Sequence, residues 1–154
     1  MYTTLVCFHL LAAAVWVGGT VALVFTAVPV LRRLPLEQRV AGMQALGRRW
    51  RPIGWTSLTV LFASGVWLAF GYWGADDGHF LVHTQNGRIL IAKAVIFLSM
   101  VASSVLHDFV LGPRLNRQIR DGRPQTLRRP MQIVGWYTFA VTIALPVLGV
   151  VLTT

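Results

Sequence analysis

The sequence has little charge and almost no cysteine. Only 12% of its 154 residues are charged, whereas a soluble domain usually carries about 25%. The single cysteine, Cys7, cannot form an internal disulfide, so it says nothing about the redox compartment. Phosphate-binding glycine loops, a nucleophile elbow and paired carboxylates in apolar segments are also missing. These absences argue against a soluble domain, a hydrolase and a phosphoryl-transfer enzyme.

Four apolar stretches make up most of the chain, at about residues 1–31, 53–73, 89–111 and 131–153. Each has the roughly 20 residues that a helix needs to cross a bilayer core of about 30 Å. The first lacks a basic n-region and is longer than the apolar core of a signal peptide, so we expect it to be retained. The sequence therefore predicts an all-α integral membrane protein, a four-helix bundle in which residues 1–154 form one transmembrane domain.

Arginines gather in two of the three connections, residues 32–52 and 112–130, and they account for most of the formal charge of +9. The remaining connection has a different set of polar residues: Asp76, Asp77, His79 and His83. The positive-inside rule predicts that both arginine-rich loops are cytoplasmic and that both termini lie outside the cytoplasmic membrane. We therefore expect the lipid bilayer, and not nucleic acid, as the partner of the positive charge.

The chain resembles itself at an offset of 84 residues. The matched pairs are His9 with Lys93, Pro29 with Pro113, Leu31 with Leu115 and Arg33 with Arg117. The second and fourth apolar stretches share Arg-Pro and Gly-Trp pairs, although at uneven spacing. The pattern predicts two parallel helical-hairpin repeats, and sites in such bundles tend to lie at the repeat interface. This points to His9 and Lys93.

Lys93 is the only lysine, and it lies about five residues inside the third apolar stretch. An ionised amine there is costly unless it snorkels to the interface or finds a partner, and both readings stay open. Two stripes at helical spacing favour an inward orientation. They consist of His9, Ala13, Trp16, Thr20 and Leu23 in the first helix, and of Lys93, Phe97, Met100, Ser104 and His107 in the third.

His9 and Lys93 are predicted at similar depth, so within one bundle they could meet. His107 follows Lys93 by 14 residues, which places it about 21 Å further along the helix. We therefore do not expect a haem held by His9 and His107 of one chain, because its two axial nitrogens must lie only about 4 Å apart. His9 could bind haem b alone, with Lys93 or with a histidine of the outer connection, and a homo-oligomer could pair two copies of His9. It could equally be a buried, hydrogen-bonded histidine.

The outer connection is a candidate metal site. His79 and His83 would share one face if the segment were helical, and imidazoles with Asp76 and Asp77 can bind copper or zinc. Glycines at 74, 78 and 87 instead favour a solvated loop. At the inner end, the pair His107-Asp108 near Arg114 suggests proton handling or helix capping, with a purely structural role as the alternative.

Several motifs together resemble the CopD copper-resistance family of membrane proteins. They are the stretch from His9 through Trp16 to Gly19, the helix end Pro29–Arg33, the segment Gly87–Lys93 and the segment His107–Arg114. The resemblance implies a non-enzymatic protein that handles copper, with His9 as leading ligand and the outer connection as an entry site. Clustered Cys and Met for soft copper(I) ligation are absent, since Cys7, Met43, Met100 and Met131 are scattered.

The positions of His9 and Lys93 are also similar to those in HemJ, a membrane protoporphyrinogen oxidase family that implies a b-type haem. The similarity carries over only to these two residues, because Ala27–Arg32 replaces the aromatic, arginine and histidine cluster of that family. A haem-dependent oxidoreductase, with His9, Lys93 and Trp16 around the cofactor, is therefore the second hypothesis. A structural or assembly subunit without metal is the third.

Overall fold

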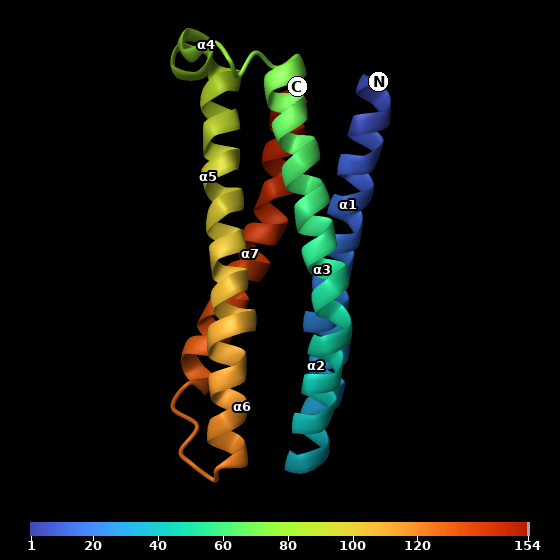
Figure 1. The fold of residues 1–154 in the computed structure, drawn as a ribbon, viewed down its shortest axis with the longest axis vertical. Coiled ribbons are helices and arrows are strands. Elements are labelled where there is room, and N and C mark those ends of the chain that lie inside the picture. Colours follow the sequence, from blue (N-terminus) through green and yellow to red (C-terminus); the bar gives the residue numbers. More distant parts are fainter. Residues whose placement is uncertain (154) are drawn as a thin grey trace. The chain divides into compact units, whose positions relative to one another are not determined.

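The structure, a computed structural model, describes residues 1–153, with side chains up to residue 150. Thr154, the last residue of the predicted domain, lies outside the described residues. In chain order the elements are α1 (Tyr2–Ala22), the π-helix η1 (Leu23–Ala27), α2 (Val28–Arg32), α3 (Leu36–Tyr72), α4 (Gly78–His83), α5 (Gln85–Val105), the π-helix η2 (Leu106–Leu111), α6 (Gly112–Arg120) and α7 (Arg128–Thr153). Every one of these elements is a helix (Figure 1).

Among the residues that the structure describes, four helical segments are long and apolar enough to cross a membrane. They run over Tyr2–Arg32, Leu36–Tyr72, Gln85–Arg120 and Arg128–Val150. The predicted all-α class with four apolar helices is confirmed.

The helices extend further than their apolar stretches. Most of the segment 32–52, predicted as a loop, belongs to α3, and α6 continues the third span to Arg120. Leu, Gln, Arg and Ala dominate the start of α3, and all four are good helix formers. With 37 residues, α3 is about 55 Å long, well beyond the bilayer core of about 30 Å. Hydropathy detects only the part of such a helix that lies in lipid, which is why the loop prediction was wrong here.

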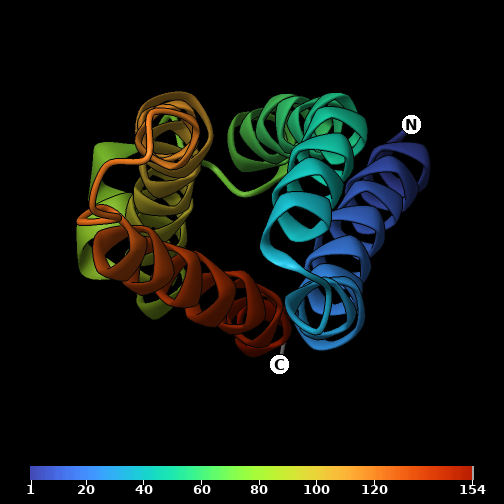
Figure 2. The same cartoon turned by 90° about the horizontal axis from the view of Figure 1, so that it is seen from below.

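The chain divides into two compact units, Met1–Ile91 and Ala92–Thr154, hereafter unit 1 and unit 2. Within unit 1, α1 packs along α3, while in unit 2 the part of α5 from Ala92 onward lies beside α7 (Figures 1 and 2). Each unit thus contains one hairpin of two long helices.

In unit 1, the contact between α1 and α3 consists of tryptophan rings that pack against glycines of the facing helix. A Cβ at Gly19 would overlap the ring of Trp50, and a Cβ at Gly54 would lie 3.0 Å from the ring of Trp16. Trp16 is only 7% exposed and its ring centroid lies 6.1 Å from that of Trp50. The two glycines therefore make room for large rings, as small residues do at helix contacts in membranes.

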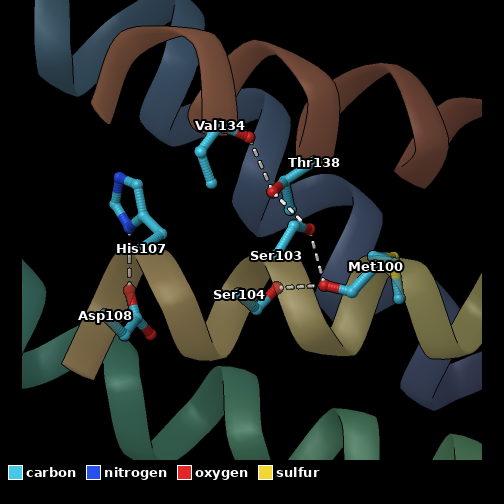
Figure 3. A network of polar contacts seen from close by, with 7 residues as sticks. All are labelled: Met100, Ser103, Ser104, His107, Asp108, Val134 and Thr138. Carbon is cyan, nitrogen blue, oxygen red and sulfur yellow. Dashed lines mark hydrogen bonds and ion pairs between the residues drawn. The ribbon is translucent and has the colours of Figure 1, made fainter. Parts of the chain in front are cut away.

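Hydroxyl groups line the corresponding contact in unit 2. Ser103 Oγ and Thr138 Oγ1 lie 2.9 Å apart (Figure 3). The Tyr137 hydroxyl donates to Ser99 Oγ at 2.8 Å. Deeper in the contact, Thr142 donates to the sulfur of Met100 at 3.4 Å, and both residues are 1% exposed. Ser103 and Thr138 also donate to carbonyls of their own helices, those of Met100 and Val134 (Figure 3). The polar groups of this contact therefore have hydrogen-bond partners and can be buried without a large desolvation penalty.

The two units repeat each other in backbone conformation. Val28 N–H donates to the carbonyl of Leu23, and Gly112 N–H donates to the carbonyl of His107. These wide π-type bonds are 84 residues apart, and each directly precedes a proline, Pro29 or Pro113. Proline cannot donate the N–H that a regular α-helix requires, and a π-segment is one way for the chain to accommodate this.

The same offset holds for contacts between helices. A Cβ at Gly65 would lie 3.5 Å from the His9 ring, and a Cβ at Gly149 would lie 3.3 Å from Lys93 Nζ. Gly149 follows Gly65 by 84 residues, just as Lys93 follows His9. The offset therefore applies to α3 and α7 as well as to the first and third spans. The Arg-Pro and Gly-Trp pairs noted in the sequence have shorter separations and do not mark equivalent positions.

Candidate functional site

His9 lies half-buried on α1 and contacts α3. Its Nδ1 lies 2.8 Å from the hydroxyl oxygen of Ser64, which in turn donates its proton to the Val60 carbonyl at 2.5 Å. Because the Ser64 proton is already directed to that carbonyl, the hydroxyl oxygen acts as acceptor toward His9. Nδ1 therefore carries a proton, and in the neutral imidazole the lone pair resides on Nε2.

This arrangement matches the state in which histidine binds metals. A neutral imidazole coordinates through one nitrogen, while its other N–H is held by a hydrogen-bond acceptor that fixes the tautomer and the ring orientation. In unit 1, Ser64 supplies that acceptor and Val60 fixes the serine in turn. Nothing in the sequence singled out Ser64, although its position beside Gly65 in an apolar helix is a typical setting for contacts between membrane helices.

Apolar hollows open on unit 1 beside Ser64. One, of about 260 Å³, is lined by Leu5, Phe8, Val60, Ala63, Ser64 and Trp67. A neighbouring one, of about 440 Å³, shares Ala63 and Trp67 and is otherwise lined by Val66, Phe70 and Gly71. Trp16, predicted as a cofactor-binding residue, packs instead against Trp50 and Gly54. It lies seven residues from His9, which is about 10 Å along the helix.

Lys93 belongs to unit 2, where it is half-buried on α5. Its amine lies close to α7, with Nζ 3.3 Å from the position that a Cβ of Gly149 would take. His9 belongs to unit 1, so the predicted meeting of the two residues stays a prediction. The side chain of Lys93 is thus directed toward α7, the partner helix of α5 in unit 2.

His107 and Asp108 form a polar pair within η2. His107 Nδ1 lies 2.9 Å from Asp108 Oδ1, and their side chains are 35% and 27% exposed (Figure 3). The imidazole ring also reaches α7, since Cδ2 and Nε2 lie 4.0 Å from a Cβ placed on Gly135. The helix continues through α6 to Arg120, so the capping role considered for this pair is wrong. Proton handling stays a prediction.

The connection between the second and third spans contains the helix α4, where glycine content favoured a loop; over Gly78–His83 that expectation was wrong. Asp77 caps this helix by accepting the His79 N–H at 2.9 Å. The rings of His79 and His83 stack with centroids 4.3 Å apart and planes inclined by 14°. Asp76 is exposed and stays a predicted ligand.

Within the described part of the chain, no group of three or more His, Cys, Asp and Glu side chains is close enough to hold a metal ion. Candidate ligands occur singly or as pairs. The predicted ligands His9, His79 and His83 are therefore found as one hydrogen-bonded imidazole on α1 and one stacked pair on α4.

Comparison with known proteins gives two findings. The family model of copper resistance protein D, CopD, matches residues 44–153. The chain is also 30% identical over 120 residues to the copper transport protein CutJ of Bacillus subtilis (strain 168). This similarity covers 78% of the chain and 20% of CutJ, so the chain spans about a fifth of the length of that curated relative. No solved structure matches the chain.

Proposed function

Because the chain belongs to the CopD copper resistance family, we propose that it handles copper as a non-enzymatic, multi-pass protein of the cytoplasmic membrane. Its copper-binding residue in the membrane is His9, acting through Nε2. The family match supports the metal, while the choice of residue rests on geometry, since His9 lies before the matched segment 44–153.

The hydrogen-bonded chain from His9 through Ser64 to Val60 carries this proposal. It fixes the orientation of the ring and directs Nε2 of the neutral imidazole toward a ligand, and imidazole nitrogen is a good ligand for copper. Lys93 contributes no ligand while its amine is protonated, because an ammonium has no lone pair.

One observation favours haem as a second candidate ligand. The hollow beside Ser64 has an almost entirely apolar lining that includes Trp67 and Phe8, as a tetrapyrrole edge would require. The same His9 Nε2 would then be an axial ligand. An absorption spectrum separates the candidates, because a Soret band with stoichiometric iron contradicts copper as the main ligand.

The test measures copper uptake into proteoliposomes that contain the purified full chain. His9→Ala should abolish uptake. Ser64→Ala should reduce it on the order of 10-fold, the size of effect seen when an orienting hydrogen bond to a metal ligand is lost. Thr59→Ala is the matched control, since Thr59 lies on the same helix and its hydroxyl donates to the Trp55 carbonyl at 2.9 Å.

Wild-type uptake by His9→Ala would contradict the proposal. A colourless, iron-free protein without copper uptake would support the remaining hypothesis of a structural or assembly subunit.

A further inference from the structure

We propose that His79 and His83 form a copper(II) chelate on the exposed surface of α4. Only the choice of copper as the metal rests on the proposed function above; the chelate itself rests on the geometry of this short helix. The ligand class is a divalent cation that prefers imidazole nitrogen, with water in its remaining coordination positions.

The two imidazoles are neighbours on α4. They are four residues apart, which puts them on one face of the helix, and their ring centroids lie 4.3 Å apart with the planes nearly parallel. Because the lone pair of an imidazole lies in the ring plane, the exposed side chains must turn out of this stack for both nitrogens to bind one ion. His83 Nδ1 donates to the carbonyl of His79 at 3.3 Å, because a carbonyl can only accept. The lone pair of His83 therefore resides on Nε2, at the outer end of the ring. Both residues are exposed and accessible to an aqueous ion.

Contacts at both ends hold this helix in place. A helix of six residues is too short to be stable alone. At its start, Asp77 accepts the His79 N–H at 2.9 Å. At its end, Thr84 donates to the Phe80 carbonyl at 2.7 Å and accepts the Gly87 N–H at 3.0 Å.

Gly87 is essential to this fixation. A Cβ at Gly87 would overlap the Phe80 carbonyl oxygen and crowd the backbone of Leu81. The first turn of α5 therefore approaches α4 more closely than any larger residue would allow. The backbone that carries both histidines is consequently ordered before a metal arrives, so little ordering entropy is lost on binding.

Copper(II) is the cation that such a pair should hold most tightly. Affinities of nitrogen sites for divalent first-row metals peak at copper, ahead of zinc. Asp76 and Asp77 lie within a few residues of the two histidines and add negative charge. This charge attracts a cation to α4, whereas the arginines elsewhere in the chain repel one.

The test is a copper(II) titration of the full chain in detergent, followed by electron paramagnetic resonance. The wild type should show hyperfine coupling to two imidazole nitrogens. His79→Gln and His83→Gln should each weaken binding on the order of 100-fold, because the second contact of a chelate forms at high effective concentration. His107→Gln is the imidazole control and should bind as the wild type does.

A second pair of variants tests the scaffold without removing a ligand. Gly87→Ala keeps both imidazoles but displaces α4, and it should weaken copper(II) binding on the order of 10-fold. Gly78→Ala is the matched control, since a Cβ there meets nothing within 4 Å. Equal affinities for these two variants would contradict the role of the scaffold.

The double variant His79→Gln, His83→Gln decides the proposal. If it keeps the two-nitrogen signal, the chelate on α4 is refuted, whatever His9 does. If it loses that signal while His9→Ala retains it, the chelate is supported independently of uptake. Failure of the proposed function is recognised separately, as wild-type uptake by His9→Ala.

Discussion

Units 1 and 2 share a backbone plan but differ in the side chains that fill it. Both have a π-segment before a proline at the 84-residue offset, and in both a glycine of the returning helix faces the residue at position 9 or 93. Unit 1 places an imidazole there and holds it with Ser64. Unit 2 places an amine there, and the residue equivalent to Ser64 is Leu148.

Comparing the two units distinguishes residues that the backbone conformation needs from residues that serve a polar site. The π-segment of unit 2 carries His107 and Asp108, whereas the equivalent positions of unit 1 are Leu23 and Val24. Since both segments have the same conformation, the prolines and not the polar pair account for it. The polar pair is thus an addition to a backbone feature that exists without it.

The largest effect is expected where the unit 1 contact is tightest. Gly19→Leu should lower the free energy of unfolding by about 2 kcal/mol, because a side chain there overlaps the Trp50 ring and overpacking costs 1–3 kcal/mol. Gly18→Leu is the control, as a Cβ at Gly18 meets nothing within 4 Å. Unfolding in mixed detergent measures both, and similar losses would contradict the packing described for unit 1.

The glycines that face positions 9 and 93 provide a matched pair for function. Gly65→Leu should displace the His9 ring and slow copper uptake about tenfold, equivalent to about 1.4 kcal/mol. Gly149→Leu should leave uptake unchanged, because the flexible Lys93 side chain can move aside and supplies no ligand. Equal slowing by both variants in the proteoliposome assay would remove the distinction between the units.

A smaller effect is expected in the π-segment of unit 2. Asp108→Ala should cost about 1 kcal/mol of stability through loss of the hydrogen bond from His107, while Asp108→Asn keeps an acceptor oxygen and should cost less. Far-UV circular dichroism should show unchanged helix content in both variants, because Pro113 and not Asp108 dictates the π-conformation. Loss of helix content in Asp108→Ala would show instead that the π-conformation depends on Asp108.

The smallest effect concerns the hydroxyl contacts of unit 2. A double-mutant cycle with Ser103→Ala and Thr138→Val should give a coupling energy of about 0.6 kcal/mol, the average for hydrogen bonds between membrane helices. Unfolding of the four proteins in mixed detergent yields this value. A coupling of zero would mean that the contact between Ser103 and Thr138 does not stabilise the packing of α5 against α7.

The sequence predicted the four spans because apolar runs of about 20 residues have few alternatives to a membrane helix. It also predicted the repeat through Pro29 and Pro113. Proline lacks the N–H of a regular helix, so it imposes the same backbone conformation in both units even where their side chains differ. Helix ends were harder to place, because Leu36–Arg51 is polar enough to resemble a loop and still has good helix formers.

The immediate surroundings of His9 could not be predicted. Ser64 follows His9 by 55 residues, and only the packing register of α1 on α3 brings them together. Helix α4 was missed for another reason: its stability depends on the contacts of Asp77, Thr84 and Gly87, which no propensity scale contains.

The most direct test of the central claim is copper K-edge X-ray absorption on the variant His79→Gln, His83→Gln, which removes the imidazoles of α4. We expect the outer-shell scattering of an imidazole ring around the bound copper, and we expect it to disappear when His9→Gln is added. Imidazole scattering that persists without His9, or its absence while His9 is present, would contradict the assignment of His9 as the copper ligand within the membrane.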